Sequence, residues 1–208
     1  MTRTVTLPAV PFDLTATPTD AWRWDEATGA VVVDAGARTD WFVDPSGGQA
    51  SGAESLLNGA TLLGEPPAGD WQLRARVRVG FGATFDAGVL MLRADDAHWA
   101  KLCFERSPAG EDMVVSVVTR EVSDDANGFV VAGGSVRLRI SRLGAAFAFH
   151  ASVDGTTWQL VRFFTLGETS SPVLVGFEGQ SPTGDGCRAS FDEVGFVAER
   201  LQDVRDGS

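Results

Sequence analysis

The chain is poor in the residues that most often build metal and redox sites. Its 208 residues include no tyrosine, two histidines and two cysteines. His98 and His150 are too few for a histidine-rich metal centre. Cys103 and Cys187 lie far apart in the sequence and fit no metal-binding or redox spacing. We therefore expect two free thiols, no metal and no cofactor.

Positive charge is scarce as well. The 17 Lys and Arg residues face 28 Asp and Glu residues, which gives a formal net charge of −11. Nucleic acids and anionic membranes are bound by clustered Lys and Arg, so this balance argues against both as partners. No apolar run approaches the length of a transmembrane helix, and the opening MTRTVTLPAVPFD lacks the apolar core of a signal peptide. We expect a cytoplasmic protein with reduced thiols.

Several catalytic signatures are missing too. The sequence has no Ser nucleophile elbow, no HExxH and no Cys/His pair at a recognisable motif. Sandwich-type glycosidases need two carboxyl groups facing one cleft. Their usual local form, an acid at every second residue of one strand, does not occur, but Glu105 and Glu178 remain able to converge from different strands. A glycoside hydrolase with an unusual acid pair therefore stays open as an alternative.

What the sequence does contain is short alternation of apolar and polar residues. About a dozen such segments are separated by turn signals, many of them among the 24 glycines, and no segment has the period of a long helix. The pattern predicts an all-β protein, a jelly-roll β-sandwich of antiparallel sheets, in one domain over residues 1–208. Residues 1–20 are expected to be extended, 121–128 to form an acidic loop and 199–208 to be a polar tail.

The segment Trp71–Phe81 shows this alternation most clearly. Apolar residues occupy one face and Arg74, Arg76 and Arg78 the other. The three arginines permit two interpretations. They form either an anion site or a solvated face that blunts self-association.

The stretch from Ala87 to Glu105 predicts a hairpin at the centre of the fold. Two strands, Ala87–Arg93 and His98–Glu105, flank a turn at Ala94–Ala97. Pairing Arg93 with Trp99 sorts the side chains cleanly, whereas a shift by one residue mixes them. One face then carries an apolar core set: Leu90, Leu92, Ala100, Leu102 and Phe104. The other carries a mixed set, which either grips a polar ligand or forms an exposed face with an ion pair: Met91, Arg93, Trp99, Lys101 and Glu105.

The same hairpin resembles that of the YesU-like family, also called the regulation-of-enolase family or domain of unknown function 1349, whose pattern is xAGxMxR…WxKxGxE. Trp99, Lys101 and Glu105 match this pattern, and Cys103 stands where the family usually has Gly. Four further patches agree in the family's order, and the resemblance spans about residues 22–197. These patches are Thr39–Asp40–Trp41; Val118–Thr119–Arg120 with Ser123 and Asp124; Ser152, Asp154, Gly155 and Trp158; and Ser181, Pro182, Gly184, Gly186 and Phe191.

The resemblance implies a fold similar to the concanavalin A-like lectins and glucanases, with two curved antiparallel sheets. The concave sheet of such folds is where sugars bind, whereas the family itself has no settled activity. We therefore expect a non-catalytic carbohydrate-binding or glycan-related protein, or one that binds another polar small molecule. The alternative is a regulatory module that docks on a protein partner such as a metabolic enzyme. The expected ligand-binding residues on the concave face are Trp99, Lys101, Glu105, Arg93, Met91, Trp41, Arg139 and His150.

Overall fold

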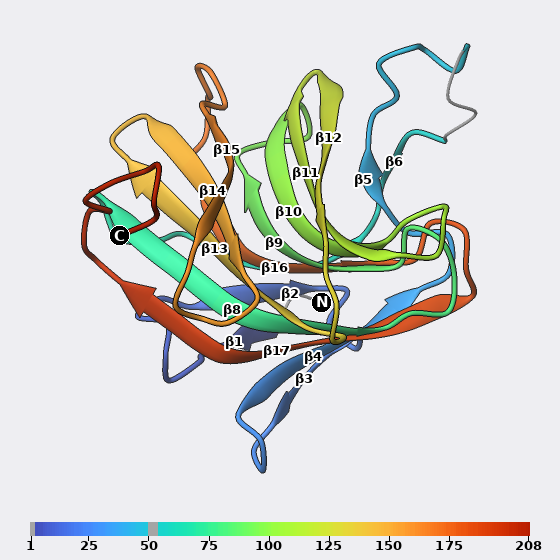
Figure 1. The fold of residues 1–208 in the computed structure, drawn as a ribbon, viewed down its shortest axis with the longest axis horizontal. Coiled ribbons are helices and arrows are strands. Elements are labelled where there is room, and N and C mark those ends of the chain that lie inside the picture. The colour runs from blue at the N-terminus through green and yellow to red at the C-terminus, as the bar shows by residue number, and fades with distance from the viewer. Residues whose placement is uncertain (1–2, 50–53) are drawn as a thin grey trace.

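The computed structural model describes residues 3–49 and 54–208, and in this part of the chain every regular element is a strand. Two large antiparallel sheets pack face to face, as the sequence predicts (Figure 1). The first, which we call the front sheet, has the spatial order β1 (Arg3–Val5), β2 (Leu14–Thr17), β7 (Ala60–Gly64), β16 (Leu174–Gln180), β9 (Ala87–Arg93), β10 (His98–Arg106), β11 (Asp112–Arg120) and β12 (Val122–Val130).

The second large sheet, which we call the back sheet, packs against the front sheet across the core. Its order is β15 (Gln159–Phe164), β14 (Ala146–Ser152), β13 (Val136–Leu143), β8 (Trp71–Gly80), β17 (Gly186–Val197), β4 (Ala30–Gly36) and β3 (Trp22–Asp25). A small two-stranded sheet, β5 (Trp41–Phe42) with β6 (Leu56–Leu57), stands apart from both. No helix in the described ranges is long and apolar enough to cross a membrane.

The core lies between the two large sheets. Alternate residues of each strand point inward, as period-two patterning requires. From the central hairpin the core takes Leu90, Leu92, Ala100, Leu102 and Phe104, which confirms the predicted inward set. Both cysteines are free, as expected, and both are buried.

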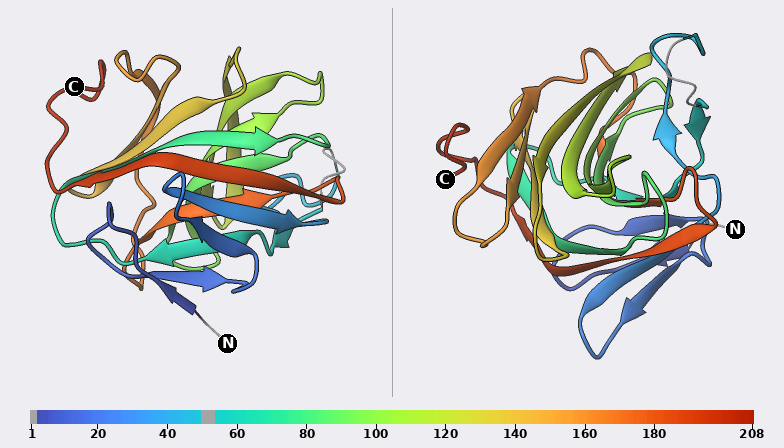
Figure 2. Two further views of the ribbon diagram at one scale, coloured as in Figure 1. Left: turned by 90° about the horizontal axis from the view of Figure 1, so that it is seen from below. Right: turned by 45° about the vertical axis from the view of Figure 1, so that its right-hand side comes forward.

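The predicted register of the central hairpin is confirmed. Trp99 pairs with Arg93, and Lys101 pairs with Met91. The odd-numbered side chains of β10 therefore lie on the face of the front sheet that points away from the core. The front sheet curls so that β10, β11 and β12 rise on one side and β5–β6 rises opposite them (Figure 2). This concave face holds the site described below.

Two segments differ from expectation. Residues 121–128 were expected to form a loop, yet Val122–Val130 is strand β12, paired with β11 at the edge of the front sheet. Most of its side chains are exposed, so the hydrophobic alternation that marks a half-buried strand is missing. The C-terminal segment 199–208, expected to be a polar tail, also packs on the protein, because Leu201 is buried and Gly207 packs against the back sheet.

Candidate functional site

The concave face begins with an apolar floor. Met91 on β9 and Trp99 and Cys103 on β10 are fully buried there, although they lie outside the main core. Trp41 of β5 covers them, and its ring meets that of Trp99 edge to face at 5.8 Å between centroids. The indole N–H of Trp41 donates to the carbonyl of Gly59 at 3.1 Å. The β5 segment is thus a packed cover over one end of the concave face.

Next to this floor lies a buried ammonium group. Lys101 is 2 % exposed, and its Nζ donates to Oδ1 of Asp40 at 2.9 Å and to Oε1 of Gln180 at 2.8 Å. Gln180 donates in turn to the carbonyl of Phe85 at 3.2 Å. Burial alone would lower the pKa of Lys101, but nearby negative groups, Asp40 foremost, raise it above its ordinary value. Lys101 is therefore a fixed positive charge that ties three separate segments together.

Two glutamates flank Lys101 on the same face. Glu105 lies two pleats along β10 and is half-buried, and Glu178 on β16 is fully buried. Burial raises the pKa of each to about 8 against the partial opposition of Lys101. Neither carboxyl oxygen of Glu178 has a hydrogen-bond partner among residues 3–49 and 54–208. At neutral pH both groups are mainly neutral acids, which can donate as well as accept a hydrogen bond.

The residues of the concave face enclose a pocket of 450 Å³. Lys101, Glu105 and Gln180 form its polar base. Asp40, in the segment before β5, and Asp125 of β12 add carboxylates. Apolar walls come from β5, β6, β11 and the loop before β9. These wall residues are Phe42, Leu56, Phe85, Val115 and Val117.

Two rim residues adopt backbone conformations that are unfavourable for their type. Phe85 has φ of 68° and Arg38 has φ of 55°, and both line the pocket. A side chain at positive φ costs on the order of 1–2 kcal/mol per residue, and such strain is typical of functional loops. Phe85 is 37 % exposed. The fold thus holds an aromatic ring open to solvent at the mouth of the pocket.

The structure brings together most of the residues that the sequence singled out. Lys101 and Glu105 line the pocket, as expected. Trp99, Met91 and Trp41 lie on the same concave face but beneath its surface, so Trp99 has no ring face open for stacking. Arg93 lies at the hairpin end, over the ring of Trp41 at 5.0 Å and paired with Asp96 at 2.7 Å.

The placement of Arg139 and His150 on the concave face was wrong. Both lie on the outer face of the back sheet, where Arg139 of β13 pairs with His150 of β14. Both are on the non-core side of their strands, since the neighbouring Leu138, Ile140 and Phe149 point into the core. A two-sheet sandwich has two such outer faces, and alternation along a strand does not distinguish them.

Sequence reasoning missed other parts of the site. Asp40 was noted only as part of a family patch, although it is the ion-pair partner of Lys101. Gln180, Phe42 and Phe85 carried no signal, because each reaches the pocket from a loop or a distant strand. No group of three or more His, Cys, Asp or Glu residues in the described ranges is arranged to hold a metal ion.

The other family patches have structural roles. Ser123 binds the β5 segment, since its Oγ accepts from the N–H of Val43 at 2.9 Å. The Ser152–Trp158 patch is a tight turn, in which Oγ of Ser152 accepts from the N–H of Gly155 at 2.8 Å. In the last patch, Oγ of Ser181 donates to Asp86 at 2.6 Å and Pro182 lines the pocket.

Comparison with solved structures supports the same architecture. A crystal structure of a functionally unknown protein from Saccharomyces cerevisiae superimposes with a TM-score of 0.72 at 26 % identity, over 86 % of this chain and 97 % of that one. The GH43 protein BlXynB from Bacillus licheniformis superimposes with a TM-score of 0.70 at 13 % identity, over 90 % of this chain and 37 % of that one. The second likeness is one of fold alone.

Sequence comparison identifies the family. The chain is 31 % identical over 140 residues to "Regulation of enolase protein 1" of Saccharomyces cerevisiae (strain ATCC 204508 / S288c), covering 66 % of this chain and 69 % of that protein. Residues 16–198 match the family described as "Protein of unknown function (DUF1349)". Family match, relative and fold agree, and the chain belongs to the DUF1349 family.

Proposed function

We propose that the concave pocket binds a neutral carbohydrate or a similar polyhydroxylated small molecule without converting it. The observation that carries the proposal is the pairing of a fixed polar base, Lys101 with Gln180 and Glu105, with the exposed ring of Phe85 at the mouth. Sugar hydroxyls donate and accept hydrogen bonds, and the base offers both kinds of partner. The apolar face of a sugar ring packs well on an aromatic side chain.

The two acids that the sequence singled out, Glu105 and Glu178, are not arranged as a hydrolytic pair. Glycosidases use two carboxyl groups that both reach the bond to be cleaved. Glu105 lines the pocket, but Glu178 is fully buried beneath the face and is not part of the lining. A ligand in the pocket would contact the first acid and not the second.

The test is a glycan array followed by calorimetric titration of the best neutral oligosaccharide, with xylo- and gluco-oligosaccharides among those spotted. We expect Phe85→Ala and Glu105→Ala each to weaken binding about tenfold, the usual effect of removing one ring contact or one hydrogen bond to a ligand. Glu111→Ala, an exposed glutamate outside the pocket, is the control. An array with no neutral sugar bound, or equal affinities for all variants, would contradict the proposal.

Glu105→Gln separates binding from catalysis. Since Glu105 is mainly protonated at neutral pH, an amide keeps its ability to donate and accept. Binding should therefore survive in Glu105→Gln, and the bound oligosaccharide should be recovered intact. Slow cleavage by the parent protein that disappears in this variant would favour the hydrolase alternative.

A second candidate is a regulatory protein that docks on a metabolic enzyme in the cytoplasm. It is supported by the name of the yeast relative, "Regulation of enolase protein 1". Sedimentation of the protein mixed with enolase tests it directly. A complex that Phe85→Ala leaves intact would place the docking surface elsewhere than the concave pocket.

A further inference from the structure

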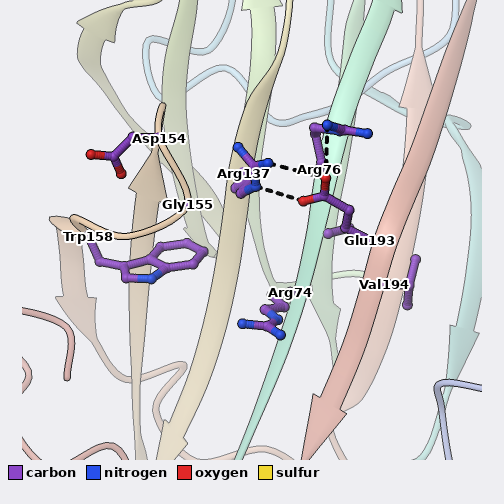
Figure 3. Close-up of a pocket in the computed structure, with 9 residues that line it drawn as sticks. Arg74, Arg76, Arg137, Asp154, Gly155, Trp158, Glu193 and Val194 are labelled. Atoms are coloured by element: carbon purple, nitrogen blue, oxygen red, sulfur yellow. Dashed lines mark hydrogen bonds and ion pairs between the residues drawn. The ribbon is translucent and has the colours of Figure 1, made fainter.

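The outer face of the back sheet carries a second pocket, on the opposite side of the sandwich from the concave one. Its volume is 520 Å³, and it lies between β8, β13, the turn after β14 and the bulge in β17 (Figure 3). Three arginines, two acids and one aromatic ring dominate its lining: Arg74, Arg76, Arg137, Asp154, Glu193 and Trp158. The arginines outnumber the acids, although the whole chain carries a net charge of −11.

Four arginines form a two-by-two array on this face. Arg76 of β8 lies opposite Arg137 of β13, and Arg74 lies opposite Arg139. Like charges directly opposite each other in an antiparallel pair are destabilising unless something neutralises them. Each arginine pair therefore needs negative groups nearby.

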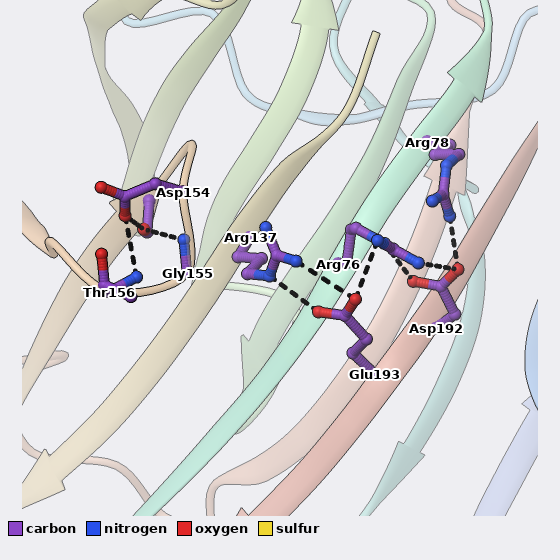
Figure 4. A network of polar contacts seen from close by, with 9 residues as sticks. Arg76, Arg78, Arg137, Asp154, Gly155, Thr156, Asp192 and Glu193 are labelled. Atoms are coloured by element: carbon purple, nitrogen blue, oxygen red, sulfur yellow. Dashed lines mark hydrogen bonds and ion pairs between the residues drawn. The ribbon is translucent and has the colours of Figure 1, made fainter. Parts of the chain in front are cut away.

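The first pair is neutralised from within the protein. Nε of Arg76 lies 2.7 Å from Asp192 and its Nη1 lies 2.8 Å from Glu193, while Nε of Arg137 lies 2.7 Å from Glu193 (Figure 4). The bulge in β17 turns both acids toward these arginines. Asp154 is also occupied, because it accepts from the backbone N–H groups of Thr156 and Thr157 at 2.8 Å each.

The second pair has no such partner. Neither Arg74 nor Arg139 forms an ion pair with a carboxylate in the part of the chain that the structure describes. Arg139 is 7 % exposed, donates from Nη2 to the carbonyl of Gly207 at 2.5 Å, and leaves Nε without a partner. Its guanidinium stacks on Trp158 at 4.2 Å from the ring centroid. Burial and the neighbouring charge of Arg74 lower the pKa of Arg139 to about 10.

We propose that this outer pocket binds a sugar or similar ring compound that carries a carboxylate or phosphate group, with the oxyanion on Arg74 and the ring beside Trp158. The planar guanidinium of Arg74 is exposed and can hold two oxygens of such a group at once. Trp158 and Arg74 lie on either side of β13 in Figure 3. A ligand that spans them therefore crosses the Arg74–Arg139 pair, which has no carboxylate partner among the described residues. The bound anion would supply the charge that Asp192 and Glu193 supply to the first pair.

The test is calorimetric titration with glucuronate, glucose 6-phosphate, glucose and inorganic phosphate at low ionic strength. We expect at least one of the two acidic sugars to bind more tightly than glucose and than inorganic phosphate. Arg74→Gln should weaken that binding by about tenfold or more, as expected for a lost hydrogen bond to a charged group. Binding should also weaken as salt is added.

Arg3→Gln is the matched control. It removes the same charge from an exposed arginine on β1 of the front sheet, one that forms no ion pair with the residues that the structure describes, and should leave binding unchanged. Glu105→Ala at the concave pocket should also leave it unchanged, which separates this site from the proposed sugar site. Because Arg74 is exposed, circular dichroism and melting of Arg74→Gln should match the parent protein.

Three results would overturn the proposal. One is that neither acidic sugar binds, and another is that Arg74→Gln binds as tightly as the parent protein. The third is that inorganic phosphate binds as tightly as the tighter-binding of the two acidic sugars, because the ring contact with Trp158 would then contribute nothing.

Discussion

Nζ of Lys101 lies 2.9 Å from Oδ1 of Asp40, although 61 positions separate the two residues in the chain. The contact joins the floor of the front sheet to the segment that enters β5, the cover of the concave face. Lys101 is buried and Asp40 nearly so, with side chains 3 % and 14 % exposed. The pocket and its cover are therefore held together by the same ion pair.

The first prediction concerns this pair. Asp40→Ala leaves a buried ammonium without its nearest counter-charge, and we expect the free energy of unfolding to fall by about 3–5 kcal/mol. Asp34→Ala is the control, since Asp34 is exposed and pairs with Arg23 and Arg188 at the surface. Exposed pairs contribute about 0–1 kcal/mol. Urea denaturation of both variants measures the difference, and equal losses would contradict the buried character of the Lys101 pair.

The second prediction concerns pH. Glu178 has its pKa raised from 4.5 to about 8 in the folded protein, mainly by burial. Between these values the unfolded chain releases the proton while the folded protein keeps it, so stability falls as pH rises. The slope from one such group is about 1.4 kcal/mol per pH unit. The melting temperature should therefore decrease steadily from pH 5 to pH 8.

Glu178→Gln should reduce this slope, because an amide does not titrate. Some dependence should remain, since the pKa of Glu105 is also raised to about 8. Glu111→Gln at an exposed position serves as the control and should keep the parent slope. Identical pH profiles for the parent protein and Glu178→Gln would show that Glu178 is not held neutral.

The third prediction concerns the thiols. Cys103 is fully buried and Cys187 is 8 % exposed. Burial raises the pKa of Cys187 to about 12 and that of Cys103 well above its ordinary value. Because the thiolate is the reactive form, a thiol reagent should find neither group in the native protein and two after denaturation without reductant. One group or none after denaturation would contradict the free thiols.

Much of the fold could be predicted from the sequence because the sheets obey a two-residue period. The register of Arg93 with Trp99 followed from one physical requirement, that the apolar side chains share a face. Strand β12 escaped prediction because it is an edge strand with few buried side chains, so no alternation marks it. Backbone pairing with β11 forms this strand, and backbone pairing leaves little trace in side-chain chemistry.

The site was predictable only in part, for a related reason. Alternation along β10 placed Lys101 and Glu105 on a non-core face, but it could not show what covers that face. The cover depends on β5 and on long-range contacts such as that of Lys101 with Gln180, which lies 79 positions away. The cover buries Trp99. The aromatic ring that is open to the pocket is instead that of Phe85, in a loop.

The fourth prediction follows from the burial of Trp99. Its ring packs on Trp41, and its indole N–H donates to the carbonyl of Asp96 at 3.2 Å. Trp99→Ala should cost about 3–5 kcal/mol of stability, the usual range for a buried aromatic residue replaced by alanine. Ligand binding should then fall only in proportion to the folded fraction. Full stability with lost sugar binding would instead show that Trp99 contacts the ligand directly.

The last prediction concerns the C-terminal tail, which docks on the back sheet through a glycine. Gly207 has φ of +76°, and a Cβ there would lie 2.6 Å from Cβ of Trp158 and 2.7 Å from Nη2 of Arg139. Nε2 of His150 lies 2.9 Å from the carbonyl of Val204, which makes the histidine a second point of attachment. Gly207→Ala should therefore detach the tail from the back sheet.

Gly133→Ala is the control, because Gly133 also has positive φ, +103°, but a Cβ there would meet nothing within 4 Å. Both variants carry the backbone penalty of a non-glycine residue at positive φ, and only Gly207→Ala adds the clash. Burial, the largest cause, lowers the pKa of His150 to about 4 against the hydrogen bond to Val204. Once the tail is released, NMR titration should find the pKa of His150 raised from about 4 toward its usual value of about 6.5, while Gly133→Ala should leave it unchanged. An unchanged His150 pKa in Gly207→Ala would contradict the expected release of the tail.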